Sequence, residues 1–291
     1  MKTPTTRRPI VSLLGIGFCI LTTSVAAQEI KLILRGDDLG MTQGSLVAVE
    51  EAMNHGVLTS TSIIVPGPWF EGAAELAARN PGWCTGVHLT LVGEWRGYRW
   101  RPVLPWDKVR SLVDEDGFLY RYPKELFAHQ PRIEEIEAEL RAQIELARKK
   151  GIRVQYLDTH YMSPSDYPGL AEVIDKMARD YDLPTQSRLA LKQVATTSKV
   201  LPEQKKERVL AALAALEPGT WFWIFHPGID SPEQNALVHF APEDIFVEGV
   251  GRQRAVETSV LTSPEMKALI LKRGIVLTSY SDLWKEMKGR K

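Results

Sequence analysis

Short apolar segments alternate along the chain with longer segments in which apolar residues recur every three or four positions. The short segments are typical of buried strands, and the longer ones of helices with one apolar face. Strands are predicted at residues 31–36, 59–65, 84–91, 153–157, 220–225 and 275–279, with a weaker one at 184–187. Helices are predicted at residues 43–55, 69–79, 133–150, 169–180, 203–216, 263–273 and 281–288.

Helix ends carry residues that favour them. Lys149, Lys150 and Gly151 give one predicted helix a basic last turn and a glycine stop. Ser263 and Pro264 give a later helix a capping hydroxyl and a proline in its first turn. Because strands alternate with helices, the strands are expected to pair in parallel through right-handed crossovers. This pattern predicts a barrel-like α/β fold with about seven parallel strands.

Two segments interrupt the alternation. Residues 240–261 show no clear period, and residues 93–131 contain several prolines and many aromatic residues. The aromatic residues are Trp95, Tyr98, Trp100, Trp106, Tyr120 and Tyr122. In an α/β barrel, long insertions after strands gather over the catalytic face. The aromatic insertion fits stacking on sugar rings, but it equally fits a loop with its own small core or a subunit contact, so a homodimer stays open.

The N-terminus has the order of a secretory signal. Basic residues precede an apolar run at 10–21, and small residues follow at 24–27, so cleavage is predicted after Ala27. A membrane anchor is the alternative, but the run is shorter than the roughly 20 apolar residues that cross a bilayer. We therefore expect residues 1–27 to be removed, no membrane span to remain, and residues 28–291 to form one exported domain, periplasmic or extracellular.

Charge and cysteine content exclude other classes. Removal of the leader takes away three basic residues from a chain with 36 basic and 36 acidic residues, which leaves a net charge of −3. No charged run indicates a nucleic-acid or membrane-surface partner. Cys84 is the only remaining cysteine, so an intramolecular disulfide is impossible, and its place in a strand predicts a core residue. Stability must come from an ordinary core.

Two adjacent aspartates, Asp37 and Asp38, follow the first predicted strand. Neighbouring carboxylates repel each other, and neither is easily buried without a cation or a proton. The pair therefore predicts a divalent metal nearby. The alternative is a purely structural role, in which these residues only cap the helix that follows.

Histidines lie at the ends of other strands. His88 lies in the third predicted strand, His160 follows the strand at 153–157, and His226 follows the strand at 220–225. Parallel strands bring such ends to one face, where barrel enzymes place their chemistry. His88 could instead be a core histidine and His226 part of a turn. Asp158 lies two residues before His160 and is expected to orient it.

One aspartate and two histidines are ordinary ligands for zinc and other divalent ions. Such an ion lowers the pKa of water and polarises a carbonyl group, while a second carboxylate accepts a proton and another histidine donates one. The chain is therefore predicted to be a metal-dependent hydrolase, with its site at the C-terminal ends of the strands. His55, near a helix end, is interpreted as structural. Arg252 and Arg254 could reach the site, but surface charge is the simpler role for both.

Six short motifs follow one another along the chain. They are RGDDLG at 35–40, GVLTSTS at 56–62, GVHLTL at 86–91, LDTH at 157–160, FHPG at 225–228 and LTSPE at 261–265. In these motifs the chain resembles the YdjC-like carbohydrate deacetylases of the chitooligosaccharide deacetylase type, from about residue 30 to residue 283. The resemblance implies a barrel-like α/β fold, a divalent ion (zinc or magnesium), and hydrolysis of an N-acetyl group from an amino sugar with release of acetate.

The resemblance also implies roles for individual residues. Asp37 would be the general base and His226 the general acid, and the metal ligands would be Asp38, His88 and His160. Two departures bear on the substrate: Met162 stands where many relatives carry a histidine, and the well-known members act in the cytoplasm. Other metal-dependent amidases or esterases, a glycolipid deacetylase and an inactive carbohydrate-binding protein are the rival functions. The intact aspartate pair and histidines argue against the last.

Overall fold

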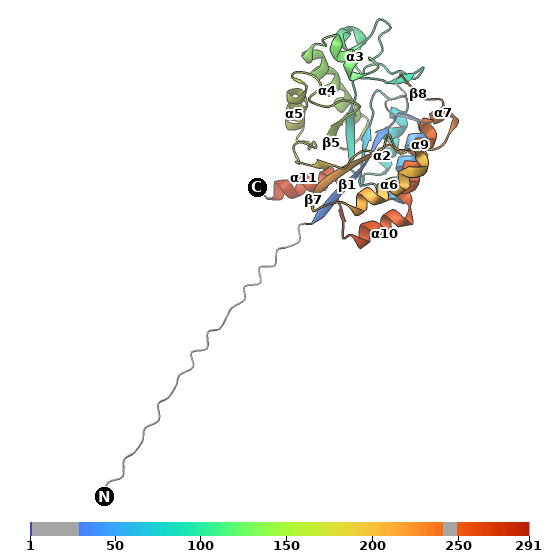
Figure 1. Ribbon diagram of the computed structural model, residues 1–291. Coiled ribbons are helices and arrows are strands. Elements are labelled where there is room, and N and C mark those ends of the chain that lie inside the picture. Colours follow the sequence, from blue (N-terminus) through green and yellow to red (C-terminus); the bar gives the residue numbers. More distant parts are fainter. Residues whose placement is uncertain (2–28, 241–248, 291) are drawn as a thin grey trace.

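The computed structural model describes residue 1, residues 29–240 and residues 249–290 (Figure 1). The predicted leader therefore lies outside the described residues, apart from Met1. Among the residues described, no helix combines the length and the apolar character that crossing a bilayer requires.

A seven-stranded parallel sheet occupies the centre of the molecule. Its strands are β1 (Ile30–Leu39), β2 (Ser60–Ile63), β3 (Thr85–Leu89), β5 (Val154–Thr159), β6 (Lys192–Gln193), β7 (Gly219–Phe225) and β9 (Val276–Leu277). Their order is β5-β3-β2-β1-β7-β6, and β9 pairs with the start of β1. The sheet curls into a half-barrel whose edges are β5 and β6, so the predicted barrel-like α/β class is confirmed.

Helices surround the sheet (Figure 1). They are α1 (Gln43–Asn54), α2 (Phe70–Arg79), α3 (Pro123–Ala128), α4 (Ile133–Lys149), α5 (Leu170–Asp180), α6 (Pro202–Ala214), α7 (Pro232–Asn235), α9 (Val250–Thr262), α10 (Pro264–Lys272) and α11 (Tyr280–Gly289). Each of the predicted helices is present, with ends shifted by at most a few residues. Figure 1 shows α6, α9 and α10 along one flank and α4 and α5 along the other.

One predicted strand was wrong, and one helix was not predicted. Residues 184–187 form a turn, and the edge strand is β6 instead. Pro184 has no N–H group to donate, and its carbonyl accepts one hydrogen bond from Leu157 N at 3.1 Å. The helix that was not predicted is α9, which begins at Val250, within the segment that showed no period, and ends at Thr262.

The aromatic insertion packs onto the main core. Its regular elements are the strand β4 (Trp95–Arg96), two 3₁₀ turns (Trp106–Lys108 and Arg110–Leu112) and α3. The strand β4 pairs with β8 (Val238–His239). Trp95 and Trp100 are buried in the same apolar cluster as the side chains of β3, α4 and α5. Figure 1 shows α3 and β8 at the end of the sheet toward which β1 runs. The insertion therefore lies beside the carboxyl ends of the strands.

Alternation along the strands separates two apolar layers. Leu32 and Leu34 of β1 point outward and pack against α6, α9 and α10. Ile33 points into the half-barrel, where it joins Cys84 and Phe222. Cys84 is thus a buried core residue, as predicted. The layer above this apolar floor is polar and begins with Arg35.

Gly86 of β3 lies directly under an aromatic ring. A Cβ atom there would lie 2.6 Å from the Tyr156 ring, which stacks on Tyr280 at 4.0 Å and whose hydroxyl is 2.7 Å from Ser62 Oγ. Because the ring is held on both sides, Gly86→Ala is expected to lower the free energy of unfolding by about 1–3 kcal/mol. Urea denaturation measures this, and an unchanged midpoint would show that the ring moves freely.

Candidate metal centre and catalytic residues

The end of β1 turns both aspartates toward the same side. In a regular strand the side chains of Asp37 and Asp38 would point to opposite faces. Asp38 instead has a φ of 64°, and the register of β1 against β2 shifts between Gly36 and Leu39. Aspartate tolerates this left-handed conformation at a cost of about 1 kcal/mol. Both carboxylates therefore enter the concave face of the half-barrel. The helix that follows is capped by Thr42, not by the aspartates.

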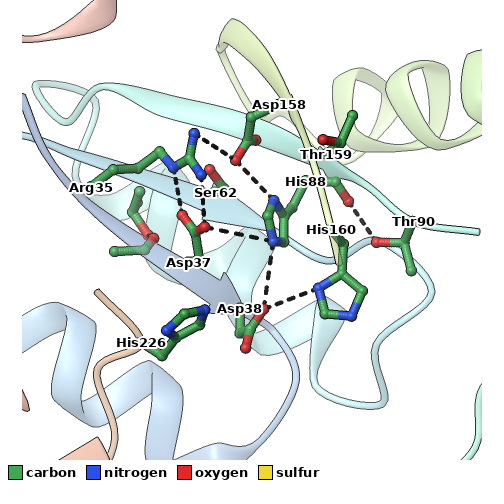
Figure 2. Close-up of polar contacts among 12 residues, drawn as sticks. Arg35, Asp37, Asp38, Ser62, His88, Thr90, Asp158, Thr159, His160 and His226 are labelled. Atoms are coloured by element: carbon green, nitrogen blue, oxygen red, sulfur yellow. Dashed lines mark hydrogen bonds and ion pairs between the residues drawn. The ribbon is translucent and has the colours of Figure 1, made fainter. Parts of the chain in front are cut away.

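Asp38, His88 and His160 converge at one point (Figure 2). Asp38 Oδ1 lies 3.6 Å from His88 Nε2 and 3.4 Å from His160 Nδ1. The potential ligand atoms of the three residues lie within 4.8 Å of one another, and all three side chains are buried. Asp38 Oδ1 makes no hydrogen bond although it is buried. A buried carboxylate oxygen that faces two imidazole nitrogens is the arrangement expected of metal ligands.

Acidic partners orient both imidazole rings. His88 Nδ1 lies 2.9 Å from Asp158 Oδ2, and His160 Nε2 lies 3.0 Å from Glu94 Oε2. An ionised carboxylate only accepts hydrogen bonds, so these ring nitrogens carry protons and the opposite nitrogens face Asp38. The sequence-based expectation that Asp158 orients His160 was wrong. Asp158 orients His88 on the neighbouring strand, and Glu94 from the insertion orients His160.

Asp37 is paired with a buried arginine. Arg35 Nε and Nη2 donate to the two Asp37 carboxylate oxygens at 2.6 and 2.8 Å, and Arg35 Nη1 lies 3.1 Å from Asp158 Oδ2. Asp37, His88 and Asp158 also lie close enough to form a ligand group. Both carboxylates of this second group already contact the Arg35 guanidinium, and Asp158 also contacts His88 Nδ1, so Asp38, His88 and His160 are the better candidates for a metal site.

A second arginine contacts Asp38. Arg254 of α9 is buried, and its Nη2 donates to Asp38 Oδ2 at 2.6 Å. Burial alone would raise the pKa of Asp38, but Arg254, followed by His160 and His226, holds it well below its usual range. The expectation of a surface charge was therefore wrong for Arg254, whereas the Arg252 side chain is exposed.

His226 follows β7 and lies on another side of the aspartate pair, as Figure 2 shows. Helix α9 positions the backbone here: Glu257 accepts a hydrogen bond from His226 N at 2.5 Å, and Thr258 Oγ1 accepts one from Gly228 N at 3.0 Å. Buried Lys205 of α6 donates to Glu257 at 2.7 Å. Burial lowers the pKa of His226, against the effect of Asp38 and Glu257, which favour its charged form.

The site attracts positive charge. It contains more buried acidic residues than buried basic ones. The acidic residues are Asp37, Asp38, Glu94, Asp158 and Glu257, and the basic ones are Arg35, Arg254 and Lys205. Burial would lower the pKa of His160, but Glu94 and Asp38 raise it to about 10. A cation is thus stabilised at this position, and the donor set fits a divalent metal.

The predicted site residues line a single cavity of about 250 Å³. It is lined by Asp37, Asp38, His88, His160 and His226, together with other residues. Trp95, Tyr161 and His239 contribute aromatic surface, and Thr196 and Ser198 contribute hydroxyl groups. The sequence did not identify Arg35 or Glu94, although Arg35 stands two residues before Asp37 on the same face of a strand.

Comparison with known proteins places this geometry in a family. Residues 31–272 match the family model described as YdjC-like protein. A carbohydrate deacetylase of Enterococcus faecalis is 32% identical over 273 residues, which cover 87% of this chain and 98% of that protein. A carbohydrate deacetylase of Thermoanaerobacter pseudethanolicus is 29% identical, with the same shares covered.

A solved structure of a proposed cellobiose-phosphate cleavage protein from Enterococcus faecalis is also similar. Its TM-score is 0.70 at 29% identity, and the match covers 88% of this chain and 99% of that one. The family match extends over most of the chain and includes β1, β3, β5 and β7, the strands at whose ends the site is built. This protein therefore belongs to the YdjC-like family.

Proposed function

We propose that this protein is a metal-dependent hydrolase that removes an N-acetyl group from an amino sugar or oligosaccharide and releases acetate. The observation that carries the proposal is the convergence of Asp38, His88 and His160 around a buried, unpartnered carboxylate oxygen beside a second aspartate. The names of the curated relatives, carbohydrate deacetylase, support the same reaction class.

Asp38 Oδ1, His88 Nε2 and His160 Nδ1 would bind the metal. Two imidazoles and one carboxylate suit zinc, whereas magnesium prefers oxygen ligands, so zinc is the expected ion of the two. The bound ion supplies polarisation of the amide carbonyl and a lower pKa for the attacking water. Arg254 occupies the second oxygen of Asp38, which leaves a single oxygen directed to the ion.

Asp37 would act as the general base. Its two hydrogen bonds from Arg35 fix the carboxylate plane, and its Oδ2 lies 3.8 Å from His88 Nε2. A proton acceptor next to the ligand set can take the proton from water as the water attacks the amide carbon. His226, which is partly exposed, would protonate the departing amine nitrogen. The C–N bond breaks, and acetate and the free amino sugar leave.

The activity is tested with the metal-stripped protein, restored with one divalent ion at a time. N-acetylglucosamine and its short oligomers are compared with acetyl esters of the same sugars, and acetate release is measured enzymatically. We expect zinc to restore release from the N-acetylated sugars. Release from the esters alone would assign an esterase, and sugar binding without acetate release under every ion would assign a carbohydrate-binding protein.

Glu94 should control metal affinity without binding the metal. Glu94→Gln removes the carboxylate that accepts from His160 Nε2, so the dissociation constant for zinc is expected to rise by about 10- to 100-fold. Calorimetric titration of the metal-free protein measures this. Glu115→Gln, an exposed change in the same insertion, is the control. Equal affinity of the Glu94 variant and the original protein would assign Glu94 to insertion packing alone.

Export is proposed as well, from the pattern of residues 1–27, and the family match begins after this segment, at residue 31. Mass spectrometry of the periplasmic or secreted protein should find Gln28 at the N-terminus. The homodimer remains a prediction that light scattering can test.

A further inference from the structure

A cavity of about 640 Å³ lies where the half-barrel is open. One wall belongs to β5 and α5, the opposite wall to β6 and β7, and the turn at 185–187 adjoins them. In the sheet order, β5 and β6 are the two edges that do not pair with each other. We call this space the seam cavity. Its volume is more than twice that of the cavity around the aspartate pair.

The seam cavity adjoins the catalytic cavity. Arg35, Thr159, Tyr161 and Ile224 line both. Arg35, which orients Asp37, lines both cavities, and Asp158, which orients His88, lines the seam cavity. The seam cavity is therefore the space next to a substrate group that is bound in the catalytic cavity, on the other side of these shared residues.

Apolar and polar side chains both line the seam cavity, and Asp175, Gln186 and Gln193 are among the polar ones. Its apolar residues include Leu157, Met162, Ala171, Ile174, Leu191 and Phe222. Two of its charged groups, Arg35 and Asp158, are paired with each other at 3.1 Å. The Phe222 ring is covered by the Arg35 guanidinium at 5.6 Å from its centroid, so one of its faces is not available for stacking on a sugar. The apolar part of this lining provides surface on which an alkyl chain can be buried.

Resting on the proposed function, we propose that the seam cavity binds the alkyl part of an N-acyl group longer than acetyl. In this arrangement the amide carbon lies beside Asp37 and Asp38, and the sugar remains in the catalytic cavity with His239, which does not line the seam cavity. The acyl chain then extends inward, past Thr159 and Ile224. The reaction is unchanged: water adds to the amide carbon, the C–N bond breaks, the fatty carboxylate leaves and the amine takes the proton.

The first measurement is kcat/KM of the zinc-loaded enzyme on N-acetyl-, N-butyryl- and N-hexanoylglucosamine, followed by release of the free amine. Because each buried methylene group contributes about fourfold, the hexanoyl substrate is expected to exceed the acetyl one by tenfold or more. Ala171→Phe places a ring in the seam cavity and should abolish this difference, with acetyl hydrolysis kept within about twofold. The control is Glu172→Phe, because Glu172 is exposed on the same helix, and this variant should keep the preference for the hexanoyl substrate.

A second measurement does not depend on turnover. Binding of hexanoate and of acetate to the zinc-loaded protein is measured by calorimetry. The dissociation constant of hexanoate should be about tenfold lower than that of acetate, and Ala171→Phe should remove this difference. If the near-ultraviolet circular dichroism of Ala171→Phe shows that this variant does not fold, Leu191→Trp, on the opposite wall, is used instead.

Equal dissociation constants for hexanoate and acetate would overturn the proposal. It would also be overturned if Ala171→Phe lowered kcat/KM only for N-acetylated disaccharides, because the seam cavity would then bind a second sugar ring. Selective hexanoate binding without hydrolysis of any sugar amide would leave the seam cavity assigned and reject the proposed function.

Discussion

Replacing Asp37 with asparagine is expected to lower turnover of the N-acetylated substrate by about 100-fold or more, the usual scale for the loss of a general base. Asparagine keeps an oxygen that can accept from Arg35, but it cannot take a proton from water. Asp37 is outside the Asp38, His88 and His160 ligand set, so zinc occupancy should be unchanged. Steady-state kinetics and elemental analysis of the same preparation measure the two quantities.

The control for Asp37→Asn is Asp114→Asn. Asp114 also forms an ion pair with an arginine, Arg99, at 2.6 Å, but it lies in the insertion and does not line the catalytic cavity. A comparable loss of turnover in both variants would mean that breaking an arginine–aspartate pair is harmful in itself. Normal turnover of Asp37→Asn would remove Asp37 from the mechanism.

Replacing His88 with alanine is expected to remove metal binding as well as activity. The change deletes the nitrogen that faces Asp38 Oδ1 and leaves Asp158 without its imidazole partner. Loss of a residue that only orients a ligand weakens metal binding by about 10- to 100-fold, and loss of the ligand itself should exceed this. The dissociation constant for zinc, measured by competition with a chelator, tests the prediction.

His55→Ala is the matched control, because His55 is exposed at the end of α1 and outside both cavities. Full zinc occupancy of His88→Ala, with the control behaving like the original protein, would contradict the ligand role of His88. Added imidazole should partly restore zinc binding to His88→Ala if only the ring is missing, and it should leave His55→Ala unchanged.

The positions of Asp37, Asp38, His88, His160 and His226 along the chain predict that they meet. Each lies at or just past the end of a strand, and parallel strands place these ends at one edge of the sheet. Local apolar periodicity is enough to find such strands and most of the helices, because it depends only on which face of each element is buried.

Helix α9 shows where this reasoning fails. Its buried positions include Gln253, Arg254 and Glu257, which are polar, so the helix has no apolar stripe to detect. Two of these buried residues contact the site: Arg254 contacts Asp38, and Glu257 contacts His226 N. The property that hides the helix from pattern analysis is the one that connects it to the site.

The sequence alone therefore determined the α/β fold and the set of strand-end residues, since both follow from local order along the chain. The pairing of those residues with their partners was decided only by the tertiary structure. The partnership of Asp158 with His88 rather than His160 depends on which strands are neighbours. The contacts of Glu94 and Arg254 depend on how an insertion and a distant helix pack. Such contacts join residues far apart in the chain, and no local pattern encodes them.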